Sequence, residues 1–378
     1  MTEGMGGLKA VVLAGGCGKR LRPLTFTRPK SMLPFLDKPI LQHIVESLAN
    51  QGFDEIIVTT NYLKKQIIDH FGDGEAFRVK MTYPREDEPL GTAGSVKNAE
   101  EHLDETFVVV QGDGITDISL KDLMRFHEEK GAIATLALTP VDNPSGYGVV
   151  ELDSNAKIVR FREKPRPEEC FSNLVNTGLY VLEPEVLEYI PVGREYDFAR
   201  DLFPKLLAME KMLYGHEAKG FWVDVGRPEK YMEAICLALG KRKERHIFKK
   251  DVEIDPEAKV GGQVILGHGC RIGKNTVVEG YSVIERDVEV ADGARITSSI
   301  IYHGSTIGHC SHINHSIIAE ECRIDSHVKI EASVVGAACK IGDKSVLHPG
   351  SKIWPETEIK HNSTMSGIIN NGRDKRLP

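Results

Sequence analysis

Positively charged side chains gather in one short stretch near the amino terminus. Between Leu8 and Leu36 the sequence has no acidic residue, but it has six basic ones: Lys9, Lys19, Arg20, Arg22, Arg28 and Lys30. Three glycines, Gly15, Gly16 and Gly18, follow an apolar run in the same stretch. Exposed backbone N–H groups and cations should therefore converge at the carboxyl end of a strand, which suits a polyphosphate. The alternative is a glycine turn beside a solvated basic face.

Two common phosphate-binding motifs are absent from this stretch. The Walker A motif requires a glycine, four residues and then Gly-Lys-Ser/Thr, and no such string occurs. The dinucleotide fingerprint would need a glycine at position 21, where the chain has Leu21. A polyphosphate site here would have to belong to another class of protein.

The composition of the chain excludes several further classes of protein. The 378 residues carry 48 Lys and Arg against 55 Asp and Glu, a formal charge of −7, which argues against a general nucleic-acid binder. The sequence has no apolar run long enough for a membrane span and no signal-peptide pattern, so we expect a cytoplasmic protein without a membrane partner. Seven cysteines without a CxxC pair predict reduced thiols.

The net charge and the pattern of apolar residues both change near residue 240. Before it the formal charge is −9, and after it +2. Short β-branched runs alternate with helix-like stretches in the first part, which is typical of a mainly parallel α/β sheet. The runs are 10–13, 55–60, 106–111 and 134–138, and the helix-like stretches include 40–51 and 120–131.

Aliphatic residues recur every six positions in the second part. From Ile254 to Ile359 they form runs that restart 17 residues apart, at 284, 301, 318 and 335. A period of six fits neither a helix nor a plain strand but fits a triangular β-solenoid of about six coils. We therefore expect a first domain at 1–240, a linker at 241–253, a solenoid at 254–360 and a tail at 361–378.

Several strings together resemble one enzyme family. They follow in the order found in the nucleoside-diphosphate-sugar pyrophosphorylases, the sugar-1-phosphate nucleotidyltransferases, and cover about residues 8–240: 13–25, 29–34, 88–94, 112–113, 146–149, 161–165, 176–178 and 222–226. The second part resembles the hexapeptide-repeat, left-handed β-helix. The resemblance implies a Rossmann-like, GT-A-like α/β domain followed by that β-helix, as in the mannose-1-phosphate guanylyltransferase branch. Ser31, where many members have proline, and Gly114 depart from the pattern.

The implied reaction joins a sugar-1-phosphate to a nucleoside triphosphate and releases pyrophosphate. A phosphate monoester is largely dianionic at neutral pH, so the nucleophile needs no general base. The difficulty is the approach of two anions, which cations relieve. The resemblance places Arg20 on the departing phosphates, Lys30 near the reacting phosphate and Lys164 on the phosphate of the sugar.

Two aspartates match the metal ligands of the family. Magnesium prefers a few carboxylates together with phosphate oxygens, and the resemblance assigns Asp113 and Asp224 to Mg²⁺. Asp113 could instead lie in a turn or cap a helix beginning near residue 115. Asp224 stands between apolar neighbours, so it requires a partner of some kind. We interpret Asp117 as a helix cap and not as a ligand.

The resemblance also assigns the remaining substrate contacts. It implies a nucleotide site that includes Leu13, Gly15, Gly16, Gly18, Glu86 and Gly91, and a sugar-phosphate site that includes Gly146, Glu163, Lys164, Asn176 and Thr177. Each residue of the sugar-phosphate site taken alone could be a surface polar residue or a turn glycine.

Glu86 bears on the choice of base. Relatives that use uridine or thymidine triphosphate commonly have a glutamine shortly before the Leu-Gly pair, and residues 84–91 contain none. Guanine presents two adjacent donors and a carboxylate only accepts, so Glu86 favours GTP. The alternative is an exposed acidic loop, and a uridylyl- or thymidylyltransferase specific for glucose-1-phosphate remains open.

The β-helix has two further interpretations. Some relatives carry an acyltransferase there, with a histidine as base, but the coils lack a long insertion to enclose the pantetheine arm. We expect instead that the β-helix mediates homo-oligomerisation or transmits regulation. For the protein as a whole, a further alternative is a catalytically silent regulatory paralogue. The sequence disfavours it because all five charged residues expected in catalysis and metal binding are present: Arg20, Lys30, Asp113, Lys164 and Asp224.

Overall fold

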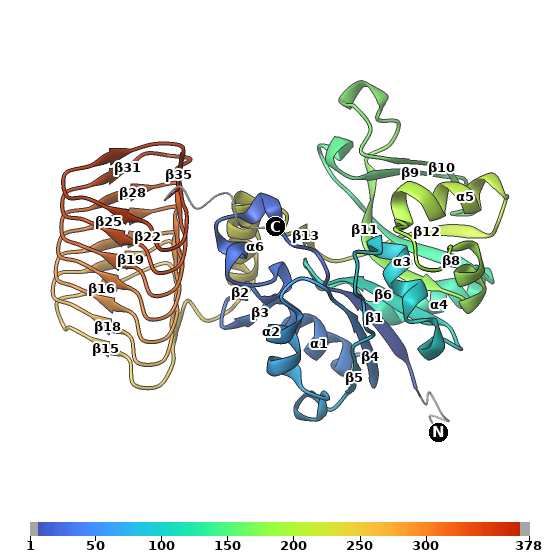
Figure 1. Ribbon diagram of the computed structural model, residues 1–378, viewed down its shortest axis with the longest axis horizontal. Helices are drawn as coiled ribbons and strands as arrows, with labels where there is room; N and C mark the ends of the chain where they lie inside the picture. The colour runs from blue at the N-terminus through green and yellow to red at the C-terminus, as the bar shows by residue number, and fades with distance from the viewer. Residues whose placement is uncertain (1–6, 371–378) are drawn as a thin grey trace. The chain divides into compact units, whose positions relative to one another are not determined.

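The structure is a computed structural model that describes residues 7–370 (Figure 1). The chain forms two compact units, each built from more than one stretch of sequence. The first contains Met1–Cys17, Pro29–Met32 and Pro39–Asp224, and the second contains Gly18–Arg28, Leu33–Lys38 and Val225–Pro378. No helix among residues 7–370 is long and apolar enough to cross a membrane.

A mixed β-sheet forms the centre of the first unit. Its strand order is β10-β9-β11-β6-β1-β4-β5, with β8 paired to β11 and β12 paired to β8. The strands are β1 Lys9–Leu13, β4 Glu55–Thr59, β5 Lys80–Thr82, β6 Phe107–Gln111, β8 Ala134–Pro140, β9 Gly148–Leu152, β10 Ile158–Glu163, β11 Leu174–Leu182 and β12 Leu213–Glu217. Strands β6, β1, β4 and β5 are parallel, as expected, whereas β11 runs antiparallel to β6, β8 and β9.

Five α-helices belong to the first unit: α1 Ile40–Asn50, α2 Lys64–Phe71, α3 Gly91–Asn98, α4 Leu120–Lys130 and α5 Phe203–Ala208. Helix α4 shows how the sequence sets their ends. Ser119 caps it by accepting a hydrogen bond from the Asp122 N–H, and Gly131 ends it in a left-handed conformation. The helix packs on β8 and β12.

The centre of the sheet is buried on both faces. Ala10, Val11 and Val12 are all fully buried because β1 lies between two parallel neighbours. In register, Leu13 is opposite both Thr59 and Gln111, so the carboxyl ends of β4, β1 and β6 lie side by side. The glycine loop and residues 112–113 leave the sheet at this edge.

A small antiparallel pair completes the first unit. It is formed by β7 (Gly114–Thr116) and β13 (Trp222–Asp224). The register pairs Asp224 with Gly114, the residue after Asp113. A strand pair between distant segments therefore brings the two predicted metal ligands together.

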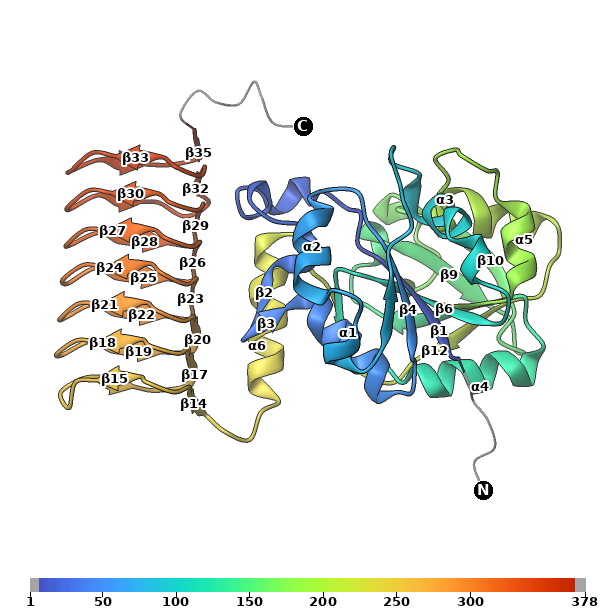
Figure 2. The ribbon, with the colours of Figure 1, turned by 60° about the horizontal axis from the view of Figure 1, so that its bottom comes forward.

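The second unit contains a parallel β-solenoid with three faces (Figure 2). The first face contains β14 His246–Phe248, β17 Gln263–Leu266, β20 Tyr281–Ile284, β23 Ile300–Ile301, β26 Ile317–Ile318, β29 Val334–Val335, β32 Lys352–Ile353 and β35 Ile368–Ile369. The second contains β15 Glu253–Ile254, β18 Arg271–Ile272, β21 Glu289–Val290, β24 Thr306–Ile307, β27 Arg323–Ile324, β30 Lys340–Ile341 and β33 Glu358–Ile359. The third contains β16 Lys259–Val260, β19 Val277–Glu279, β22 Arg295–Thr297, β25 His312–Asn314, β28 Lys329–Glu331, β31 Val346–Leu347 and β34 Thr364–Met365.

The 17-residue repeat corresponds to one turn of the solenoid. Ile284, Ile301 and Ile318 are paired in register, and their side chains are buried inside. The serines that begin the repeats also stack, because the Ser316 N–H donates to the Ser299 Oγ at 3.1 Å and the Ser333 N–H to the Ser316 Oγ at 3.1 Å. The repeat thus aligns both the aliphatic core and a polar ladder.

The solenoid is longer than the sequence indicated. Its faces have eight, seven and seven strands, about seven turns instead of the expected six. Strand β14 falls within the expected linker and β34 and β35 within the expected tail. The spacing of six continues at Phe248 and Met365, but neither is Ile, Leu or Val, so the aliphatic pattern did not reveal these strands. Residues 371–378 of the expected tail and residues 1–6 of the expected first domain lie outside the described residues.

The second unit also contains helix α6 (Pro228–Gly240) and two short segments from the amino-terminal part of the chain. The segment Gly18–Arg28 forms two 3₁₀ turns, η1 (Lys19–Leu21) and η2 (Leu24–Phe26). Strands β2 (Pro34–Phe35) and β3 (Lys38–Pro39) follow a third turn, η3 (Lys30–Met32).

Candidate active site

Lys30 links the two predicted metal ligands. Its Nζ forms an ion pair with the Asp113 Oδ2 and a second with the Asp224 Oδ1 at 3.5 Å. The Lys30 side chain is only 9% exposed, whereas each aspartate side chain is 31% exposed. The arrangement holds one ammonium beside two carboxylates whose outer oxygens remain open to a ligand.

Backbone geometry places Asp113 at the edge of the sheet. The Gly112 N–H donates to the Leu13 carbonyl at 3.0 Å, which ties the end of β6 to β1. A side chain at Gly112 would bring its Cβ to 2.8 Å from the same carbonyl oxygen, so only glycine fits there. Asp113 follows at once and faces Lys30.

The expected helix near residue 115 is a strand, so the helix-cap interpretation of Asp113 is wrong, whereas its interpretation as a turn residue is confirmed, because residues 112–113 form a turn. Residues 114–116 form β7, and Ser119 caps the helix that follows. Asp117 is not a helix cap either, because its Oδ1 accepts a hydrogen bond from the Phe221 N–H at 2.6 Å. It joins the segment that follows β7 to the segment that precedes β13.

The glycine loop is divided between the two units. In the first unit the Ala14 N–H donates to the Thr59 carbonyl at 2.8 Å, and Gly15 and Gly16 follow with exposed backbones. In the second unit Gly18 is left-handed, with φ 59°, and its carbonyl accepts hydrogen bonds from the Leu21 N–H at 2.9 Å and the Thr25 hydroxyl at 2.9 Å. Arg20, in the turn that follows, is exposed.

Glu86 is buried, contrary to the alternative of an exposed loop. It is 7% exposed, and its Oε1 accepts a hydrogen bond from the Leu90 N–H at 3.3 Å. Gly91 then begins α3 with φ +72°, and a side chain there would collide with the Tyr196 carbonyl oxygen, 2.7 Å from its Cβ. The carboxylate is therefore fixed at the start of a helix whose first residue must be glycine.

Glu163 and Lys164 lie at the end of β10, beside the 146–148 turn. The Lys164 Nζ pairs with the Glu163 Oε1 at 3.0 Å, and its backbone N–H donates to the Tyr147 carbonyl at 2.9 Å. The Lys164 side chain is 63% exposed. Gly146 has open space around its Cα, whereas a side chain at Gly148 would meet Glu163. The lysine can thus exchange Glu163 for another anion.

The side chains of Asn176 and Thr177 form hydrogen bonds with other groups of the protein. The Asn176 Nδ2 donates to the Tyr180 hydroxyl at 2.9 Å, and its Oδ1 accepts from the Gly178 N–H at 3.0 Å. The buried Thr177 hydroxyl donates to the Ala137 carbonyl at 2.8 Å. Burial raises the pKa of the Tyr180 phenol, against the opposing effect of its bond to Asn176, so it stays neutral. Both side chains lie within β11, at the register shift around Gly178, and direct contacts between them and a sugar stay predictions.

Sequence reasoning missed Gln111 and Tyr147 and noted Trp222 only as an apolar neighbour. Gln111 and Trp222 line a cavity of about 60 Å³ together with Thr177. The Tyr147 and Trp222 rings meet edge to face, with centroids 5.4 Å apart. The position of Gln111 directly before the Gly-Asp pair was the one available signal.

The fold and site define a nucleotide-dependent transferase: a sheet edge with a glycine loop, a buried lysine and paired carboxylates. Residues 9–240 match the model of the nucleotidyl transferase family, to which the chain belongs, and residues 271–369 match the model described as the GMPPB C-terminal domain.

Individual relatives agree with this assignment. A mannose-1-phosphate guanyltransferase of Candida albicans is 34% identical over 96% of this chain and 100% of its own length. A UTP–glucose-1-phosphate uridylyltransferase of Synechocystis is 37% identical over 80% of this chain and 84% of its own. The crystal structure of HddC from Yersinia pseudotuberculosis complexed with GMP-PN has a TM-score of 0.53 and 28% identity, covering 60% of this chain and 97% of that one.

Proposed function

We propose that the chain forms GDP-mannose and pyrophosphate from GTP and mannose-1-phosphate. The observation that carries this proposal is the convergence of Asp113 and Asp224 on Lys30. Similarity to mannose-1-phosphate guanyltransferases over their entire length, including the carboxyl-terminal domain, supports the choice of substrates.

The residues present fit Mg²⁺. Asp113 and Asp224 offer oxygen ligands only, lie close enough to share one ammonium, and are each about a third exposed. When bound, Mg²⁺ neutralises and orients phosphate oxygens. Loss of either carboxylate would leave a poor site for a hard divalent cation.

The side chains of the protein supply charge and position. An oxygen of the sugar phosphate forms a bond to the α-phosphorus, while the bond from that phosphorus to the bridging oxygen breaks and pyrophosphate leaves. Lys30 holds a positive charge at the sheet edge, Lys164 binds the phosphate of the sugar and Arg20 the departing phosphates. Positioned charge of this kind lowers the barrier without a proton transfer.

Glu86 supports the choice of GTP. One of its oxygens is fixed by the Leu90 N–H, which orients the carboxylate and leaves its other oxygen as the acceptor for guanine. The 37% identity to a uridylyltransferase favours a second candidate, UTP with glucose-1-phosphate.

Pyrophosphate release tests the substrates. The purified protein would be assayed with GTP, UTP, dTTP and ATP, each against the 1-phosphates of mannose, glucose and N-acetylglucosamine. We expect GTP with mannose-1-phosphate to give the highest kcat/KM. A clear preference for UTP or dTTP would refute the role of Glu86.

We further propose that the chain works in the cytoplasm as a homo-oligomer assembled through its β-helix. The solenoid has exposed sheet faces and end coils, which association would cover. Light scattering after size exclusion should give a multiple of 41.9 kDa. A monomer at micromolar concentration would contradict this, and consumption of acetyl-coenzyme A with an amino-sugar phosphate would favour the acyltransferase instead.

A further inference from the structure

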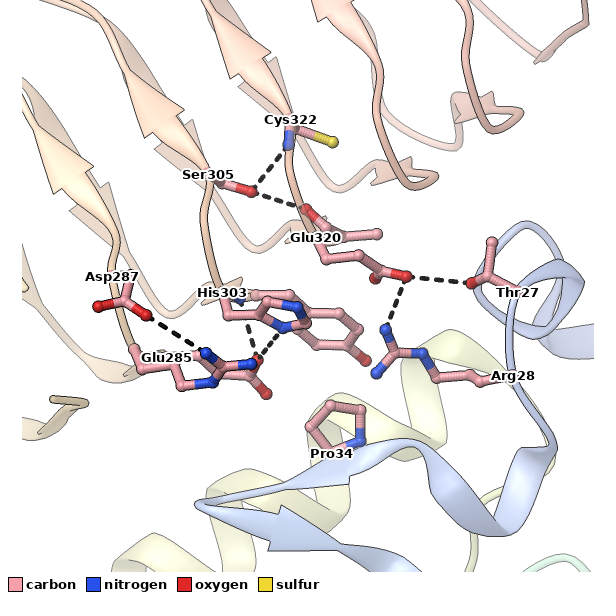
Figure 3. A network of polar contacts seen from close by, with 12 residues as sticks. Thr27, Arg28, Pro34, Glu285, Asp287, His303, Ser305, Glu320 and Cys322 are labelled. Atoms are coloured by element: carbon pink, nitrogen blue, oxygen red, sulfur yellow. Dashed lines mark hydrogen bonds and ion pairs between the residues drawn. The ribbon is translucent and has the colours of Figure 1, made fainter. Parts of the chain in front are cut away.

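The end of the glycine-loop segment is bound to the β-helix (Figure 3). The Arg28 Nη2 pairs with the Glu320 Oε1 at 2.7 Å, and the Thr27 hydroxyl donates to the same oxygen at 3.2 Å. All three residues belong to the second unit. One carboxylate of the solenoid therefore holds two consecutive loop residues.

The solenoid fixes Glu320 firmly. Glu320 follows Ala319 at a corner between β26 and β27. The Ser305 hydroxyl, one turn below, donates to the Ala319 carbonyl at 2.8 Å and accepts from the Cys322 N–H at 3.0 Å. The backbone on both sides of Glu320 is thereby held by a neighbouring coil.

The ion pair is largely removed from water. The Arg28 and Glu320 side chains are 15% and 14% exposed, and the Arg28 guanidinium lies 5.3 Å from the centre of the Tyr302 ring. Burial alone would raise the pKa of Glu320, but attraction to Arg28 and the hydrogen bonds from Arg28 and Thr27 outweigh it, so the pKa lies below its ordinary value. Removing one partner would leave the other charge buried and unpaired.

Aromatic contacts hold the neighbouring loop residues. The Phe26 and Trp354 rings pack with centroids 4.6 Å apart, and the Arg22 guanidinium lies 4.7 Å from the centre of the Phe26 ring. This chain of contacts runs from the solenoid to Arg22, two residues from Arg20. It ties the whole η2 turn to the β-helix.

The segment 33–38 is tied down as well. The Pro34 carbonyl accepts a hydrogen bond from the buried Tyr231 hydroxyl of α6, which lies 3.1 Å from the Tyr302 hydroxyl of the solenoid. Lys249 forms an ion pair with Asp37 at 2.8 Å. The segments on both sides of Lys30 in the sequence are thus anchored within the second unit.

We propose that Glu320 is a positioning residue for nucleotidyl transfer: through Thr27 and Arg28, the β-helix fixes the loop that carries Arg20 and leads into Lys30. This inference rests on the function proposed above. It assigns the β-helix an indirect part in triphosphate binding, exerted through the loop, in addition to any role in assembly.

Two substitutions and a matched control test the proposal. Glu320→Ala removes the carboxylate, and Glu320→Gln keeps its shape for the case in which the alanine variant folds poorly. Glu321→Gln changes the adjacent, exposed acid. We expect kcat/KM for GTP to fall on the order of 10- to 100-fold in both Glu320 variants, as for other misplaced catalytic groups. The KM for mannose-1-phosphate should change less than about twofold.

A charge exchange separates positioning from general destabilisation. The double variant Arg28→Glu with Glu320→Arg should recover most of the activity that either single change removes. Unchanged kinetics in both Glu320 variants would overturn the proposal. So would equal losses for both substrates that simply follow a lower melting temperature.

Measuring triphosphate binding directly tests the positioning role of Glu320 independently of the proposed reaction. Calorimetric titration with GTP and with UTP in Mg²⁺ needs no turnover, and both should bind Glu320→Gln more weakly than the wild type and Glu321→Gln. If the wild type released no pyrophosphate with any pair of substrates, the proposed reaction would fail. Unaltered triphosphate affinity in the Glu320 variants would contradict the positioning role whatever the reaction is.

Discussion

Asp113 and Asp224 come from segments more than a hundred residues apart, yet both contact Lys30. We expect Asp224→Asn and Lys164→Ala each to lower kcat on the order of 10²-fold or more, because each removes a charge that stabilises the reacting phosphates. Pyrophosphate release at saturating substrate measures this.

Asp117→Asn provides the control for the first prediction. This aspartate accepts a hydrogen bond from the Phe221 N–H and has no proposed contact with substrate. Its substitution should affect the melting temperature more than kcat. Near-normal rates in both Asp224→Asn and Lys164→Ala would overturn the site.

The substitution Glu86→Gln tests whether Glu86 recognises the guanine base. The amide oxygen can still accept from the Leu90 N–H, so the fold should be kept, but the amide nitrogen would face a guanine donor. We expect the ratio of kcat/KM for GTP to that for UTP to fall roughly 10-fold or more. An unchanged ratio would remove Glu86 from base recognition.

Residue types and spacing indicated much of this site but not its finer contacts. Asp113 and Asp224 stood out because they match the metal ligands of the family that the sequence resembles, and because Asp113 ends an apolar run while Asp224 stands between apolar neighbours. Asn176 and Thr177 looked equally available, but they bond to Tyr180 and to a backbone carbonyl. The Thr177 bond crosses to β8, and the Asn176–Tyr180 bond forms where the register of β11 shifts, so the local sequence could not reveal either contact.

At the scale of the elements, the solenoid interior offers a direct test of packing. Ile313 is 1% exposed and lies in register between Ile296 and Ile330. Ile313→Ala should reduce the free energy of unfolding by about 2–5 kcal/mol, because it leaves a cavity between two coils. Ile313→Val should cost only about 0.5–1.5 kcal/mol. Equal, small losses in chemical denaturation would contradict a close-packed interior.

The Arg28–Glu320 pair predicts a pH dependence of stability. The pKa of Glu320 in the folded state lies below its ordinary value of 4.5, so the carboxylate stabilises the fold above that pH and the effect is lost as the pH falls through the lowered pKa. Arg28 and Thr27 contact Glu320 directly, Tyr302 lies near both Glu320 and Arg28, and Glu285 acts on Arg28 and Tyr302.

Glu320→Gln isolates this effect. At pH 7 the wild type should unfold at a higher denaturant concentration than the variant, and the difference should shrink progressively below pH 4.5. A difference that stayed constant into acid would show that the carboxylate charge contributes nothing to stability.

The hexad period predicted the solenoid because its interior accepts one aliphatic side chain per face. The pattern of Ile, Leu and Val could not show its ends, where Phe248 and Met365 take the inward positions. The alternation of the first 240 residues likewise predicted the parallel strands. It gave no sign of the antiparallel half, whose pairings join strands distant in sequence.

At the scale of the whole chain, the change in charge and apolar pattern predicted one domain boundary near residue 240. Contacts instead assign the short segments 18–28 and 33–38 to the same unit as the β-helix. These contacts span nearly 300 residues, as between Thr27 and Glu320, and arise only in the folded chain. No local pattern can predict a division of that kind.

Phosphorus NMR of the purified protein with GTP, mannose-1-phosphate and Mg²⁺ tests the central claim most directly. We expect GDP-mannose and pyrophosphate to appear in equal amounts, and Asp113→Asn to form both on the order of 10²-fold more slowly. Release of inorganic phosphate in place of pyrophosphate, or equal rates in the wild type and the variant, would contradict it.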